Sequence, residues 1–86
     1  MMTSCYSNTK EGKAEFIAEV IEPFVQTEGH FIRAEYVTSV PELGEGEWIK
    51  LTTPEGKNLF ININLDSIQA VARDFVRQYL SCIAKA

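Results

Sequence analysis

The residues best suited to chemistry are few and stand apart from one another. His30 is the only histidine, and the two cysteines, Cys5 and Cys82, lie near opposite ends of the 86-residue chain. A general base needs a positioned partner and a metal site needs several ligands, and neither arrangement is visible around these residues. Two cysteines are fewer than a secreted disulfide framework of this size usually has, and they lack a CxxC spacing, so we interpret them as free thiols of a reducing compartment. The alternative is a disulfide bridge that joins the two ends of the chain. The sequence therefore predicts a protein that is not an enzyme and that binds no cofactor.

A second group with chemical potential is the acidic segment 42–47, where three glutamates alternate with two glycines. It lacks the dense Asp and Asn ligands of a hand-type calcium loop. It also lacks the third glycine, the Lys-Ser/Thr pair and the following helix that a phosphate-binding loop requires. We interpret the segment as a solvated acidic loop and predict no metal ligands.

Charge and hydropathy narrow the classes of partner. The net charge of −4 opposes binding to double-stranded nucleic acid and to anionic membranes, because both depend on Lys and Arg. No apolar run approaches the roughly 20 residues of a membrane span, and the first ten residues do not resemble a signal peptide. We therefore expect a cytoplasmic protein whose partner is another protein or a second copy of itself, most simply in a dimer.

The first helix is predicted from apolar residues at three-and-four spacing between residues 16 and 25. Thr9 is the expected N-cap. Pro23 interrupts the pattern, and because the apolar residues continue beyond it, we expect a kink or an irregular last turn rather than an end. Residues 1–8 are expected to form a flexible tail, and residues 9–86 a single α-β-β-β-α domain.

Three strands are predicted after Gly29, at residues 30–37, 47–53 and 57–64. The proline and glycine within residues 53–57 indicate a tight turn. A three-residue loop there sets Leu51 opposite Leu59 and Ile49 opposite Ile61, so that both strands place apolar residues on one face. The expected fold is α+β, a two-layer domain of helix, three-stranded antiparallel meander and helix, with both helices on one sheet face. The first strand is expected to add Ile32, Ala34 and Tyr36 to that face.

The opposite sheet face is the predicted interaction surface. Three of its residues are aromatic, and an uncovered apolar patch rimmed by polar groups often marks an interaction site. Its expected members are Phe31, Arg33, Trp48, Lys50, Phe60 and Asn62. Replacing its aromatic residues is expected to leave the fold intact. An alternative is that the nine-residue connection 38–46 folds over this face, with Val40 and Leu43 as its anchors, and a further alternative is that the aromatics only stabilise the sheet.

The last helix is predicted from an apolar stripe that runs from Ile68 to Ile83, with Phe75 at its middle. Asp66 and Gln69 are expected to form a capping box at its start. The order of elements is also that of the double-stranded-RNA-binding domain, but residues 65–69 lack the lysines with which that family holds phosphates.

The strand-to-helix junction at residues 60–74, FININLDSIQAVARD, resembles short uncharacterised proteins of bacteria, phages and mobile elements. The resemblance implies a setting, that of small accessory or inhibitor proteins which act by binding. It assigns no site residues.

Three functions remain open from the sequence. The first is a non-enzymatic interaction protein that works through the open sheet face or as a homo-oligomer. The second is a small-ligand binding or sequestering protein with a pocket at a subunit interface and residues 38–46 as a lid. The third is a single-stranded nucleic-acid binder that stacks bases on the aromatic residues of the open face.

Overall fold

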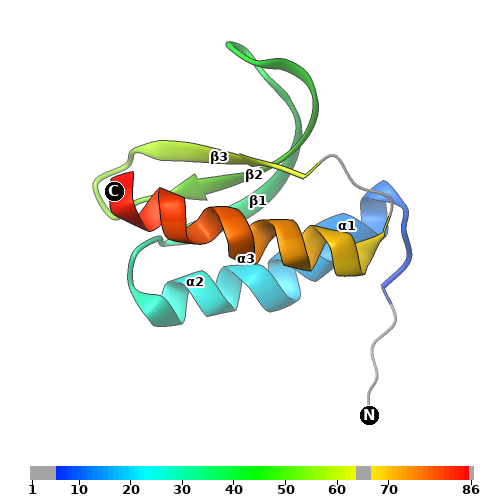
Figure 1. Ribbon diagram of the computed structural model, residues 1–86, viewed down its shortest axis with the longest axis horizontal. Coiled ribbons are helices and arrows are strands. Elements are labelled where there is room, and N and C mark those ends of the chain that lie inside the picture. The colour runs from blue at the N-terminus through cyan, green and yellow to red at the C-terminus, as the bar shows by residue number, and fades with distance from the viewer. Residues whose placement is uncertain (1–5, 64–66, 86) are drawn as a thin grey trace.

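Three antiparallel strands form one layer of the molecule, in the spatial order β1-β2-β3. The computed structural model describes residues 6–63 and 67–85. The strands are β1 (Arg33–Val40), β2 (Gly44–Thr52) and β3 (Asn58–Asn62). Figure 1 shows the helices together on one side of this sheet. The α+β class predicted from the sequence, with a three-stranded antiparallel sheet and helical segments before and after it, is confirmed.

The register predicted for the second hairpin is also confirmed. Ile49 pairs with Ile61, and Leu51 pairs with Leu59. The turn closes with a hydrogen bond from the Gly56 amide to the Thr53 carbonyl at 2.9 Å. Gly56 has a φ of 92°, a left-handed conformation that glycine adopts without steric cost.

The N-terminal helical span passes Pro23 without ending. It consists of α1 (Lys10–Phe16), the π-helical turn η1 (Ile17–Ile21) and α2 (Glu22–Glu28). Because Pro23 has no amide, it cannot donate to the carbonyl four residues before it. The preceding amide, of Glu22, donates to the Ile17 carbonyl five residues away, as a π turn requires. The irregular turn expected at the proline is therefore a single widened turn.

This widened turn keeps one apolar row aligned with the sheet. In a regular α-helix, residues four apart drift by about 40° around the axis. The extra residue taken up by a π turn offsets that drift. Ile17, Ile21 and Val25 are accordingly 1%, 3% and 0% exposed. The residues immediately before them, Phe16, Val20 and Phe24, form a second apolar row.

Helix α3 (Ile68–Lys85) is capped by Ser67, whose Oγ accepts from the Ala70 amide at 3.2 Å. The Ile68 amide donates to the Asn8 side-chain oxygen at 3.1 Å. The helix thus begins one residue later than the predicted capping box implies, and Asp66 lies outside the described residues. The tail expected over residues 1–8 is anchored on α3 at its described end.

The main core lies between the sheet and the helices. Its buried residues come from both helical spans and from only one sheet face, so both spans cover the same face, as predicted. The members are Ile17, Ile21, Val25, Phe31, Ala34, Ile49, Leu51, Ile61, Ile63, Val71, Phe75, Tyr79 and Cys82.

The start of the first strand differs from the prediction. Ile32, expected in the core, is 46% exposed, whereas Phe31, expected on the open face, is 1% exposed and belongs to the core. The strand begins only at Arg33. Side chains alternate between faces only within a pleated strand, so the alternation does not extend back to these two residues.

Residues 38–46, expected to form a loop, are the outer end of the β1-β2 hairpin. The register shifts between Val37 and Ser39, which marks a bulge. Bulges bend and twist a strand, and Figure 1 shows this end of the hairpin (green) curving away from the rest of the sheet. Of the two expected anchors, Val40 is buried and Leu43 is exposed.

Candidate functional site

The sheet face opposite the helices carries mostly polar and charged side chains at its surface. Arg33 is exposed and forms an ion pair with Glu35. Lys50 and Phe60 lie opposite each other and are partly buried, and Asn62 is exposed. This face is therefore less apolar than the sequence predicts.

Trp48 is the main reason for that difference, because it is only 6% exposed. A Cβ atom built on Gly46 would lie 3.0 Å from Cη2 of the Trp48 ring, so the hairpin backbone lies directly on the indole. Since Phe31 is in the core, Phe60 is the only one of the three expected aromatics that keeps part of its surface exposed. The apolar patch predicted on this face is not formed.

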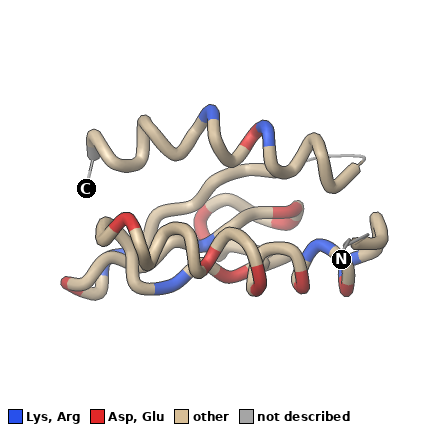
Figure 2. The backbone as a smooth tube through the Cα atoms, turned by 90° about the horizontal axis from the view of Figure 1, so that it is seen from below, with Lys and Arg blue, Asp and Glu red and all other residues tan. Residues whose placement is uncertain are grey.

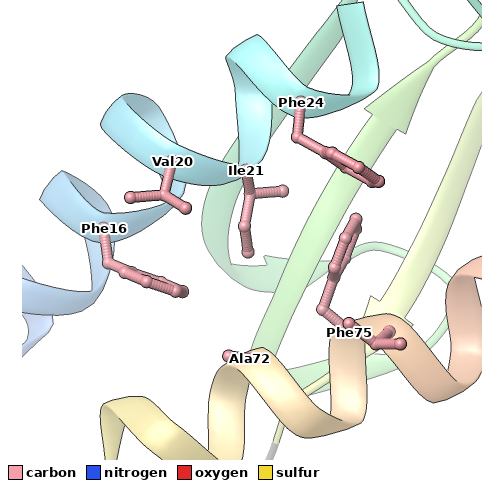
Figure 3. A pocket seen from close by; sticks show the side chains of 7 residues that line it. Phe16, Val20, Ile21, Phe24, Ala72 and Phe75 are labelled. Atoms are coloured by element: carbon pink, nitrogen blue, oxygen red, sulfur yellow. The ribbon is translucent and has the colours of Figure 1, made fainter. Parts of the chain in front are cut away.

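An apolar groove lies instead between the two helical spans. Figure 3 shows side chains from the N-terminal span and from α3 facing each other across it. We call it the interhelical groove. It is lined by Phe16, Val20, Ile21, Phe24, Ala72, Phe75 and Val76. Val20, Phe24 and Val76 are 43%, 45% and 62% exposed, and Leu80, further along α3, is 68% exposed.

The groove exists because each helical span has two adjacent apolar rows and the sheet covers only one of them. In the N-terminal span the apolar residues come in consecutive pairs, such as Val20 with Ile21. Helix α3 has the same kind of pair in Phe75 with Val76. Consecutive helical residues are about 100° apart, so one member of each pair faces the sheet and the other faces outward. From the sequence alone, the two rows of α3 form a single apolar stripe from Ile68 to Ile83. The doubled width of the stripe was the signal for the exposed row.

Stacked aromatic rings form the floor of the groove at its α2 end. Phe75 stacks on Tyr79 with ring centroids 5.1 Å apart. Phe24 meets the Phe75 ring edge-on at 6.1 Å and the Tyr79 ring at 5.5 Å. Aromatic pairs of this geometry add about 0.5 to 1.5 kcal/mol each beyond their burial. These contacts hold the Phe24 and Phe75 rings in place on the two sides of the groove.

The size of the groove decides what it can hold. Its hollow has a volume of about 180 Å³. A cavity of roughly 150 Å³ accepts one benzene molecule, whereas sites for small ligands usually span roughly 300 to 1,000 Å³. The hollow thus accepts one aliphatic or aromatic side chain, and the exposed residues around it offer a wider contact surface.

A more polar hollow continues the groove towards the start of α3. It shares Phe16 and Val20 and adds Tyr6 and Ser67 to its lining. The Tyr6 ring packs edge-on against Phe16, and its hydroxyl donates to Glu19 at 2.8 Å. This hydrogen bond to a carboxylate is the main cause that raises the pKa of Tyr6. The N-terminal segment thereby forms part of the wall at this end of the groove.

A buried ion pair joins α1 to the hairpin. Lys13 is 5% exposed, and its Nζ lies 2.6 Å from Oε1 of Glu47. Burial, and then the charge of Glu47, raise the pKa of Tyr36. Pairing satisfies the buried ammonium, so Lys13 has a structural explanation.

No metal site is formed by the part of the chain that the structure describes, because no three His, Cys, Asp or Glu residues there could hold an ion. His30, the only histidine, is exposed. None of the described helices is long and apolar enough to cross a membrane.

Comparisons with protein-family models, curated proteins and solved structures give no match to this chain.

The hydroxyl of Tyr79 leads to a test of the groove floor. This oxygen is buried and has no hydrogen-bond partner among the described residues. An unsatisfied buried hydroxyl is destabilising, so we expect Tyr79→Phe to match the wild type or to be up to about 1 kcal/mol more stable at neutral pH. Urea denaturation measures this change, and a loss of more than about 1 kcal/mol would show that the hydroxyl has a partner.

The same variant has an expected pH dependence. Burial, and then the charge of Glu28, raise the pKa of Tyr79 in the folded state. The folded state then holds the proton more tightly than the unfolded state. The tighter hold on the proton contributes fully to the free energy of unfolding at pH values below about 10, the pKa of tyrosine in the unfolded state. This contribution is lost as the pH rises through the pKa of Tyr79 in the folded state. The stability gap between Tyr79→Phe and the wild type should therefore widen in favour of the variant above about pH 10.

Proposed function

We propose that this chain is a non-enzymatic, cytoplasmic interaction protein and that the interhelical groove is its docking surface. The observation that carries the proposal is the row of exposed apolar side chains along the groove, Val20, Phe24, Val76 and Leu80. A contiguous exposed apolar patch of this kind is unfavourable in water and commonly marks a protein-binding site.

Recognition of a partner protein follows from the shape of this surface. One side chain of the partner would enter the hollow, and neighbouring side chains would cover Val76 and Leu80. An amphipathic helix has this arrangement, because its residues at i, i+3, i+4 and i+7 lie on one face. Buried aromatic and aliphatic anchors of that type usually dominate the energy of an interface.

The two alternatives from the sequence have less support. Small-ligand sites usually enclose roughly 70 to 90% or more of the ligand surface. The walls of this groove are open to solvent. Residues 38–46 belong to a hairpin that packs on Trp48, which leaves them less free to act as a lid. Base stacking requires exposed rings, and two of the three expected platforms, Phe31 and Trp48, are buried.

Selection from a displayed library of helical peptides tests the proposed docking surface. We expect the selected peptides to be amphipathic, with aromatic or aliphatic anchors on one face, and to lose at least about tenfold in affinity for Val76→Glu. Leu43→Glu is the matched control, because Leu43 is an exposed apolar residue at the distant hairpin tip. Peptides that bind both variants equally, or a selection against the monomeric protein that yields no specific binder, would contradict the proposal.

A further inference from the structure

We infer that the natural occupant of the interhelical groove is the same groove of a second copy, in a dimer whose two-fold axis runs along the groove. This inference rests on the proposed function, because it names the partner for that docking surface. Two observations support the inferred dimer: the charges on either side of the groove and the direction in which the helices run.

The two sides of the groove have opposite charge. The N-terminal span, residues 10–28, contains five Glu and two Lys, and one of these lysines, Lys13, is already held by Glu47. In α3, residues 68–84 contain two Arg and one Asp. Figure 2 shows acidic positions along the N-terminal span and mainly basic positions along α3. A partner that complements this surface needs a basic and an acidic side of its own.

The helices on the two sides run in the same direction. Phe16 and Ala72 line the groove near the beginning of both spans, and further along Phe24 contacts Tyr79. A two-fold axis along the groove then places each acidic span over the basic helix of the other copy. An axis across the groove would place the two acidic spans over each other and the two basic helices over each other. Coulomb attraction favours the first arrangement and opposes the second.

One pair of residues defines the contact. Glu19 lies about one helical turn from Phe16, and Arg73 lies about one turn from Val76, so each borders the groove on its outer side. Both are exposed, and Arg73 has no ion pair among the described residues. In the favoured arrangement, Glu19 of each copy meets Arg73 of the other, which gives two equivalent pairs as an isologous interface requires.

The helix side offers enough surface for a small interface. The whole molecule, seen from the helix side in Figure 2, extends 34 Å by 19 Å. That outline is smaller than the roughly 800 Å² that each partner contributes to a standard interface and near the roughly 600 Å² of the smaller, weaker interfaces. The exposed Val76 and Leu80 of the second copy are aliphatic groups of the size that the hollow of about 180 Å³ accepts.

Charge reversal tests the arrangement by sedimentation velocity over a range of protein concentrations. We expect the wild type to dimerise, and we expect Glu19→Arg and Arg73→Glu each to weaken the dimer at least about tenfold, because both pairs become repulsive. An equimolar mixture of the two variants should form a heterodimer, since both of its pairs are attractive again. The double variant Glu19→Arg/Arg73→Glu should dimerise like the wild type.

Circular dichroism confirms that each variant is folded before it is used. Glu19→Gln and Arg73→Gln provide milder versions, and glutamine at position 19 keeps an oxygen that can accept from the Tyr6 hydroxyl. These two should weaken the dimer by an intermediate factor. A dimer that is insensitive to the charge changes, or a mixture that stays monomeric, would overturn the inferred arrangement.

A wild type that stays monomeric at every concentration would overturn self-association but not the docking surface. The peptide selection distinguishes these cases. Peptides that bind the groove of a monomeric wild type would leave the proposed function standing with a different partner, whereas failure of both experiments would remove both proposals.

Discussion

Replacing Phe75 by alanine is expected to lower the free energy of unfolding by about 3 to 5 kcal/mol. Phe75 is 4% exposed and stacks on Tyr79 while also meeting the ring of Phe24. Its removal would leave a cavity under the groove and would take away the stacking partner of the floor. Chemical denaturation followed by far-UV circular dichroism measures the change.

The adjacent residue provides the control for Phe75→Ala. Val76 lies one position further along α3 but is 62% exposed. Val76→Ala removes apolar atoms that are already in water, so its cost in a dilute monomer should stay within about 0.5 kcal/mol. Equal costs for the two substitutions would show that the sheet-facing and outward-facing rows of α3 have been exchanged.

The sequence predicted those parts of the fold in which two independent patterns agree. The turn at residues 53–57 and the apolar alternation of β2 and β3 both require Ile49 opposite Ile61, and the structure has this pair. Phe75 was likewise expected in the core because it lies mid-stripe on the last helix. Where local turn geometry and burial of the apolar face require the same register, few alternatives remain.

The groove could not be located in the same way, because the apolar pattern of a helix shows how wide its apolar stripe is but not which part of that stripe the sheet covers. Phe24 and Ile21 fall on the same broad stripe, yet they are 45% and 3% exposed. Which row is covered depends on the breadth of the three-stranded sheet and on the π turn before Pro23. Both are tertiary features that the spacing of apolar residues does not contain.

The hairpin end was mispredicted for a related reason. The one proline and two glycines of residues 38–46 are typical of loops, and the sequence therefore favoured a connection that leaves the sheet. In the structure, glycines serve the hairpin itself. Gly44 adopts a φ of 93° at its turn, and the absence of a side chain at Gly46 lets the backbone approach the Trp48 ring. A glycine that permits close packing and a glycine that ends a strand look the same in one sequence.

Trp48→Ala is consequently expected to cost about 3 to 5 kcal/mol, in contrast to the sequence-based expectation that this residue can be replaced without loss of the fold. Trp48 is 6% exposed, and it is held outside the helix-side core, against the hairpin at Gly46. Its loss should remove the contact that holds the bent hairpin on the sheet. Urea denaturation measures the loss in free energy of unfolding. Trp48→Phe, which retains an aromatic ring, should show a smaller loss.

Because Trp48 is the only tryptophan, its fluorescence reports the same packing in the unmodified protein. A buried indole emits at shorter wavelength than an indole in water, so the emission should be blue-shifted even at high dilution and should move to the red only on unfolding. Association through the interhelical groove should leave this emission unchanged, since the indole lies on the other side of the sheet from the helices. A red-shifted emission in the dilute folded protein, or a Trp48→Ala cost below about 1 kcal/mol, would show that the hairpin does not pack on the indole.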